Sequence, residues 1–220
     1  MVSVEQNLTE YDYLPEEVGY FSERENRGGS IGEAALKYSE QEQLLAFLKE
    51  KNEAAEGIFI DPKDLIFEES VKMNCYYCGK YNNNWRCPPN LPEVDFQKMM
   101  CEYDAGLFVA LMYNIDDSED YNTVRTESSV TLHRLMLILE KWMWDNNFST
   151  AISFIAGSCK LCKGGCGKDK CNNPYMARSP LESIGVNVVK SARKYGIDIR
   201  FPADKKMMRI GLLLWQEEEE

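Results

Sequence analysis

Hydrophobic positions along the chain follow two patterns, one with helical spacing and one with short unbroken runs. In the longest stretch of helical spacing, Leu132, Leu135, Met136 and Leu139 recur every three or four residues, so they share one face of a helix. The same spacing, with polar N-caps and glycine stops at some ends, predicts helices over residues 39–56, 92–103, 122–146 and 181–195.

Short apolar runs between these segments indicate strands. The run from Gly106 to Tyr113 is apolar at every position, which is typical of a strand buried on both faces. Two short strands are expected within residues 57–73, around a turn at Asp61 and Pro62. Further strands are predicted over residues 106–113, 151–156, 197–201 and 207–215, the last two as a hairpin.

The alternation of these elements predicts an α/β (or α+β) fold with a single mixed sheet flanked by helices. Most of the cysteines fall in two groups, and each group follows a predicted strand and precedes a predicted helix. We therefore expect two cysteine-rich loops at one sheet edge, close to each other.

Charge divides the 220-residue chain into unequal parts. The net charge is −11, and residues 1–70 account for all of it with 17 acidic and 6 basic side chains. The predicted organisation is an irregular acidic N-terminal segment over residues 1–38, a metal-binding α/β domain over 39–216 and an acidic tail over 217–220. An acidic chain is a poor candidate for binding duplex nucleic acid.

The chain also has no apolar run long enough for a membrane span and no secretory signal pattern at its start. These two observations predict a cytoplasmic protein. Thiols stay reduced in that compartment, so the eight cysteines are not expected to form disulfides, and seven of them are expected to bind metal.

Seven of the eight cysteines form the two groups. Four of them lie within thirteen residues, a spacing that can wrap a [4Fe–4S] cluster, and nearby glycines and lysines suit a negatively charged cluster. Zinc is the alternative, since two Cys-x2-Cys pairs can close a tetrahedron, although that arrangement leaves three cysteines unused. The first group is Cys75, Cys78 and Cys87, and the second is Cys159, Cys162, Cys166 and Cys171.

The first group offers only three ligands for a second metal centre. Its fourth ligand would be Cys101, His133 or a carboxylate, or else one iron stays open to a small-molecule substrate. Cys101 stands alone on a predicted helix, where a cysteine is usually a small buried hydrophobe. His133 is the only histidine, so it is the best general-acid candidate, although a lone helical histidine is more often structural. Glu140, two turns later, and Arg125 are further candidates for handling protons.

A combination of motifs resembles a known family. It consists of Cys75-Tyr-Tyr-Cys78, Trp85-Arg-Cys87-Pro-Pro, Leu132-His133 with Glu140, Ala156-Gly-Ser-Cys159-Lys-Leu-Cys162, Cys171-Asn-Asn-Pro174 and Arg178-Ser-Pro-Leu-Glu182. Over about residues 65–200 the chain is similar to the predicted metal-binding proteins called domain of unknown function 2284. The resemblance implies a soluble, cytoplasmic, iron–sulfur protein of anaerobic microbes and does not imply a particular reaction.

Two classes of function follow. In the first, the protein carries one [4Fe–4S] cluster and a second metal centre, and it transfers electrons to a redox partner protein or performs cluster-based redox chemistry. In the second, zinc or a cluster only stabilises the fold, and the protein binds a partner through its acidic N-terminal segment. The sequence leaves open whether the protein is an enzyme.

Overall fold

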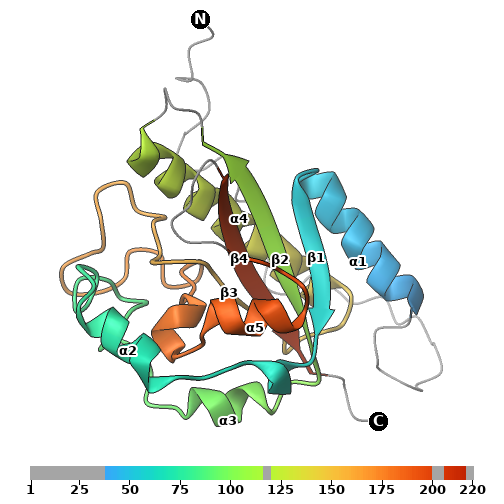
Figure 1. Cartoon of the computed structure of the whole chain (residues 1–220), viewed down its shortest axis with the longest axis horizontal. Coiled ribbons are helices and arrows are strands. Elements are labelled where there is room, and N and C mark those ends of the chain that lie inside the picture. Colours follow the sequence, from blue (N-terminus) through green and yellow to red (C-terminus); the bar gives the residue numbers. More distant parts are fainter. Residues whose placement is uncertain (1–37, 116–119, 200–205, 217–220) are drawn as a thin grey trace, which may run out of the picture. The chain divides into compact units, whose positions relative to one another are not determined.

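The structure is a computed structural model that describes residues 38–115, 120–199 and 206–216. Its centre is a four-stranded sheet in the order β1-β2-β4-β3, and every neighbouring pair is antiparallel (Figure 1). The predicted α/β (or α+β) fold with a single sheet flanked by helices is confirmed, and the four strands are antiparallel where a mixed sheet was expected. The strands are β1 (Ala55–Ile60), β2 (Ala105–Asn114), β3 (Ile152–Phe154) and β4 (Lys206–Trp215).

β2 is buried on both faces from residue 106 to residue 111, as predicted, whereas Met112 is exposed. β2 pairs with β4 over its whole length, from Ala105 opposite Trp215 to Asn114 opposite Lys206. Successive side chains of β2 enter two different hydrophobic cores, with Leu107 in one and Phe108 in the other. Each face of the sheet is therefore covered by other elements.

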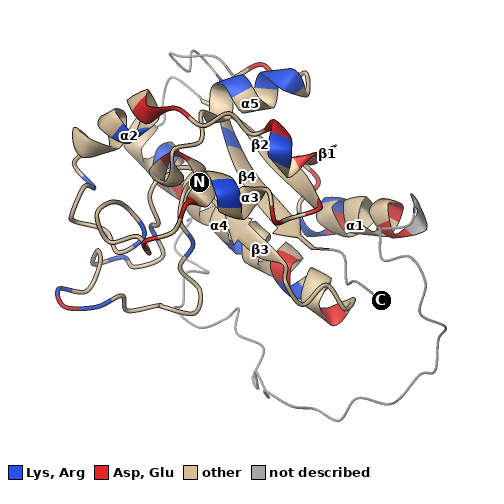
Figure 2. Ribbon diagram, turned by 90° about the horizontal axis from the view of Figure 1, so that it is seen from below, with Lys and Arg blue, Asp and Glu red and all other residues tan. Residues whose placement is uncertain are grey.

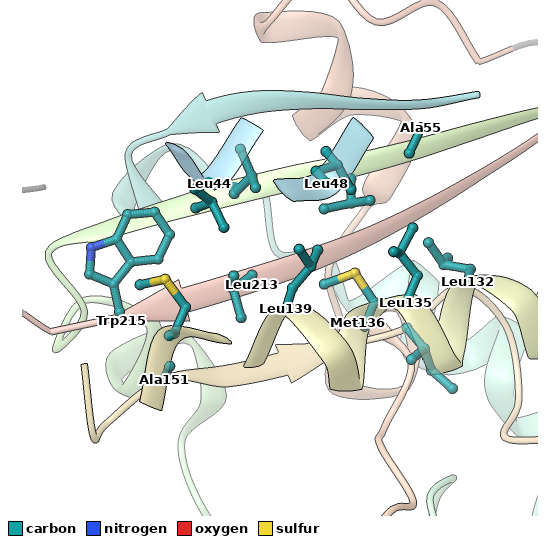
Figure 3. Close-up of a cluster of buried hydrophobic side chains, with 14 of the residues drawn as sticks. Leu44, Leu48, Ala55, Leu132, Leu135, Met136, Leu139, Ala151, Leu213 and Trp215 are labelled. Carbon is teal, nitrogen blue, oxygen red and sulfur yellow. The ribbon is translucent and has the colours of Figure 1, made fainter. Parts of the chain in front are cut away.

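Helices α1 (Tyr38–Lys51) and α4 (Tyr121–Asp145) cover one face. Figure 3 shows Leu135, Met136 and Leu139 of α4 in the same cluster as Leu48 of α1 and Leu213 of β4. The Asp120 side chain caps α4 by accepting a hydrogen bond from the Thr123 N–H.

The other core lies beneath shorter elements. It contains Met100 of α3 (Phe96–Met100), Ala192 of α5 (Val188–Lys194) and Leu181 of a 3-10 turn, η2 (Leu181–Ile184). The remaining elements are a 3-10 turn, η1 (Pro62–Asp64), and helix α2 (Glu69–Tyr76).

The structure departs from the predicted elements in five places, one of which is the predicted helix 92–103, shortened to α3. The predicted helix 181–195 is divided into η2 and α5, because Gly185 adopts a left-handed φ of 98° and ends η2. The predicted helix 39–56 ends at Lys51, and β1 starts before Gly57. The second strand expected within 57–73 is a single bridge at Phe67 followed by α2. Residues 197–199 form no strand, and the rest of that prediction lies outside the described residues.

Two further predictions concern the chain as a whole. The acidic segment 1–38 and the tail 217–220 lie almost entirely outside the described residues, so they remain predictions. Within the described parts, none of the helices combines the length and apolarity needed to cross a membrane.

Candidate metal centre

The two cysteine groups lie on two long segments that meet beside α2 (Figure 1). Cys75 lies in the last turn of α2, and Cys78 and Cys87 lie in the loop that follows it. The second group occupies the segment after β3, at the edge of the sheet. Only this second group follows a strand as predicted, since the first group begins inside a helix.

One short stretch, residues 84–86, joins the two segments by three hydrogen bonds. Asn84, which is only 5% exposed, donates from Nδ2 to the Cys159 carbonyl at 3.0 Å. Trp85 Nε1 donates to the Gly167 carbonyl at 2.8 Å, and Arg86 Nη2 donates to the Pro174 carbonyl at 2.7 Å. Buried amide and indole groups need such partners, so these bonds fix the two segments against each other.

The thiols of both groups share one electrostatic environment. Burial, followed by the negative charges that Cys75, Cys78, Cys159 and Cys166 carry as thiolates, raises the pKa of Cys87 to about 12. Burial also raises the pKa of Cys75 and of Cys159. The structure therefore brings cysteines of the two groups together, as the sequence predicts.

The sulfur atoms have hydrogen-bonding neighbours suited to metal ligands. Asn173 Nδ2 donates to Cys162 Sγ at 3.0 Å, and Cys75 Sγ–H donates to the Glu182 carbonyl at 3.5 Å. All eight cysteines are free thiols. In the described residues no three Cys, His, Asp or Glu side chains form a ready-made ligand group. Free thiols bind metal by releasing their protons, so free thiols on two segments packed together fit a thiolate-bound metal.

Cys101 lies apart from this environment. It is an exposed residue that caps the C-terminal end of α3, and it is not among the thiols that affect Cys87 or Cys159. The expectation that a lone helical cysteine is buried is wrong here. As a candidate fourth ligand of the first group, Cys101 has no support from the structure.

His133 is a buried anchor of the second segment. It is 1% exposed, and its Nε2–H donates to the Met176 carbonyl at 2.9 Å. Burial lowers the pKa of the ring to about 4, so it is neutral near pH 7. A neutral ring already bound to the backbone is a poor general acid, and the structural interpretation of this histidine is the better one.

Glu140 and Arg178 form a second anchor. Glu140 is 2% exposed, and its carboxylate accepts a pair of hydrogen bonds from Arg178, one of them from Nε at 2.9 Å. Arg178 Nη1 also donates to the Tyr175 carbonyl at 2.9 Å. The motif contains both residues, but sequence spacing gives no signal of their pairing. The pair ties the end of the second segment to α4.

Cations gather where the second segment leaves β3. Lys160 is half-buried, and its Nζ donates to Ser129 Oγ at 2.9 Å. Burial, with the positive charges of Arg209, Arg125 and Lys80, lowers the pKa of Lys160 to about 8. Figure 2 shows basic residues along this segment. The sequence gives no signal that Arg209 belongs to this site, because β4 is brought here only by its pairing with β2 and β3.

A buried carboxylate acts on both the cations and the first cysteine group. Burial raises the pKa of Glu182, and its Oε2 atom has no hydrogen-bond partner. Its charge acts on Cys75, Lys160 and Arg209 alike. The motif contains Glu182, but its unpartnered atom is visible only in the structure.

Comparison with known proteins gives one match. A family model described as a predicted metal-binding protein (DUF2284) matches residues 58–215. The matched range contains both cysteine groups, His133 and the Glu140–Arg178 pair. No curated protein and no solved structure matches the chain.

Proposed function

Because the chain belongs to the DUF2284 family of predicted metal-binding proteins, we propose that it is an iron–sulfur protein that transfers electrons or performs cluster-based redox chemistry. One [4Fe–4S] cluster is held by the four-cysteine group. A second metal centre is held by the three-cysteine group. The proposed ligands are Cys159, Cys162, Cys166 and Cys171 for the cluster and Cys75, Cys78 and Cys87 for the second centre.

The observation that carries this proposal is the packing of the two cysteine segments through residues 84–86. It gathers thiols that are far apart in the sequence, and it leaves them as free thiols. Zinc would need only four of the seven ligands, so two separate groups of four and three favour clusters over one zinc site. The Asn173 bond to Cys162 Sγ is typical of the N–H···S contacts that tune cluster potentials.

A bound cluster supplies one-electron chemistry, and the chain's own residues define how it is reached. Cys78 is exposed, and the rings of Tyr76 and Tyr77 beside it are 57% and 78% exposed. An exposed aromatic surface next to a metal centre suits contact with a redox partner protein. We place this activity in the cytoplasm of an anaerobe, where thiolates and clusters are not oxidised.

Metal analysis of anaerobically purified protein tests the proposal. We expect brown protein with about four or eight irons per chain and matching sulfide. Cys171→Ser should lose one cluster, whereas Cys101→Ser, the matched control outside the site, should keep all its iron. Colourless protein with one or two zinc ions would instead favour the non-catalytic alternative, in which the metal only stabilises the fold.

A ligand-binding measurement separates the two forms of the proposal. Cyanide or a small thiol is added to the reduced protein, and the EPR spectrum is recorded. A changed spectrum indicates an iron that lacks a protein ligand and that can bind a small-molecule substrate at the three-cysteine centre. An unchanged spectrum favours fully ligated centres and electron transfer alone.

A further inference from the structure

The cations beside the second cysteine segment are arranged around Gly157. This glycine has a left-handed φ of 66°, and a side chain there would start 3.8 Å from Lys160 Nζ and 4.0 Å from Arg209 Nη1. The two positive groups therefore approach the same point from different elements. Gly157 lies two residues before Cys159, a proposed ligand of the cluster.

Hydrogen bonds that Lys160 and Arg209 donate to neutral oxygen atoms hold these two cations in place. Arg209 Nε donates to Ser128 Oγ at 3.1 Å, and Arg209 Nη2 donates to the Arg125 carbonyl at 3.0 Å. Lys160 donates to Ser129 Oγ and, at 3.2 Å, to the Ser158 carbonyl. These bonds fix the direction of each side chain without neutralising its charge.

No carboxylate in the described part of the chain forms an ion pair with Lys160, Arg209 or Arg125. Arg178, the other half-buried arginine near the site, has Glu140 as its partner. Lys160 and Arg209 are partly buried, Arg125 is exposed, and the positive charges of the three side chains repel one another. The buried Glu182 carboxylate acts on Lys160 and Arg209, but one negative charge does not balance three positive charges. An anion from solution would relieve this repulsion.

We propose that Lys160, Arg209 and Arg125 bind a small molecule through an oxyanion, either a carboxylate or a phosphate, beside the second cysteine segment. A guanidinium group presents a planar pair of N–H donors that matches either oxyanion, and an ammonium group adds a point charge. This inference deepens the proposed function, because it names the ligand class that would be held next to the metal centre.

Calorimetric titration of the full chain, purified anaerobically, tests the site. Inorganic phosphate and succinate serve as probes, with chloride keeping the ionic strength constant. We expect saturable binding of at least one probe, and Arg125→Gln should weaken it about tenfold. Arg134→Gln is the matched control, since Arg134 is also an exposed arginine on α4 but is not among the charges that act on Lys160 or Arg209.

Arg209→Gln is the second variant, and it should weaken probe binding at least as much as Arg125→Gln does. Its melting temperature shows whether the variant is still folded. Binding of phosphate alone or of succinate alone supports the site and identifies its oxyanion. The proposal is overturned if neither probe binds at about 10 mM, or if Arg134→Gln weakens binding as much as Arg125→Gln. Iron content is measured on the same samples, so a protein that binds the probe but no iron contradicts only the proposed function.

Discussion

His133 and Glu140 are polar side chains that face the same segment from one side of α4. His133 donates to the Met176 carbonyl and Glu140 accepts from Arg178, so both contact the stretch that closes the second cysteine group. Both side chains are buried and hydrogen-bonded, so removing either one should lower the stability of the fold. Single substitutions can measure these contributions separately.

The acid sensitivity of the protein should depend on His133. Its pKa is about 4 in the folded state against 6.5 ordinarily, so the folded protein disfavours the protonated ring. Stability is therefore complete above pH about 6.5 and falls by about 3 kcal/mol as the pH approaches 4. His133→Gln, measured by urea unfolding across this range, should reduce that loss. An unchanged pH profile would contradict the buried neutral ring.

The Glu140–Arg178 pair should contribute far more to the unfolding free energy than an exposed ion pair on the same helix. Arg178→Met leaves the buried Glu140 carboxylate with Ser153 as a hydrogen-bond donor but without its counter-charge, which should cost about 3–5 kcal/mol of unfolding free energy. Lys141→Met removes an exposed pair with Asp145 and should cost below about 0.5 kcal/mol. Chemical denaturation compares the two, and similar losses would mean that the buried pair is not structural.

Elements differ in how far the sequence predicts them. α4, β2 and β4 follow from local patterns because a long apolar stripe or an unbroken apolar run has one favourable structure. The first cysteine group has no such pattern, so its start within α2 was not predicted. The division of residues 181–195 depends on Gly185 and on the bridge from Val186 to Phe67, a contact between distant parts of the chain. The cysteine spacing alone suggests the proposed ligands, whereas the anchors and cations around them come together only through the sheet.

The stretch of residues 84–86 should control how the two cysteine segments dock. Asn84→Ala removes the bond to the Cys159 carbonyl and the side-chain acceptor for the Arg86 N–H. We expect a loss of about 1–3 kcal/mol and weaker metal retention. Asn83→Ala is the control, because Asn83 is exposed and bonds only within its own loop. Equal retention of metal in a chelator-competition assay would show that this docking is unimportant.

The whole molecule depends on close packing between α4 and the sheet. A side chain on Gly211 of β4 would start 2.6 Å from Met136 Sδ and 3.1 Å from the Phe154 carbonyl. Neighbours on both sides must move to accept it, so overpacking should affect the fold as a unit.

Gly211→Ala should therefore lower the unfolding free energy by about 1–3 kcal/mol. Gly79→Ala is the control, since a side chain there meets nothing within 4 Å. Thermal unfolding followed by circular dichroism compares the variants. If Gly211→Ala melts at the wild-type temperature, α4 and β4 do not pack tightly at Gly211 and Met136.

The strand order has a consequence for biosynthesis. β3, which leads into the second cysteine segment, pairs only with β4 among the described strands, and β4 is made about fifty residues later. A nascent chain that has emerged only to residue 205 has both cysteine groups but no strand between β2 and β3. We hypothesise that cofactor insertion waits until β4 leaves the ribosome, which would keep iron from an unfinished site. Stalled chains that lack β4 should take up no iron–sulfur cluster from a donor that loads the full chain, and uptake by those stalled chains would refute this order of maturation.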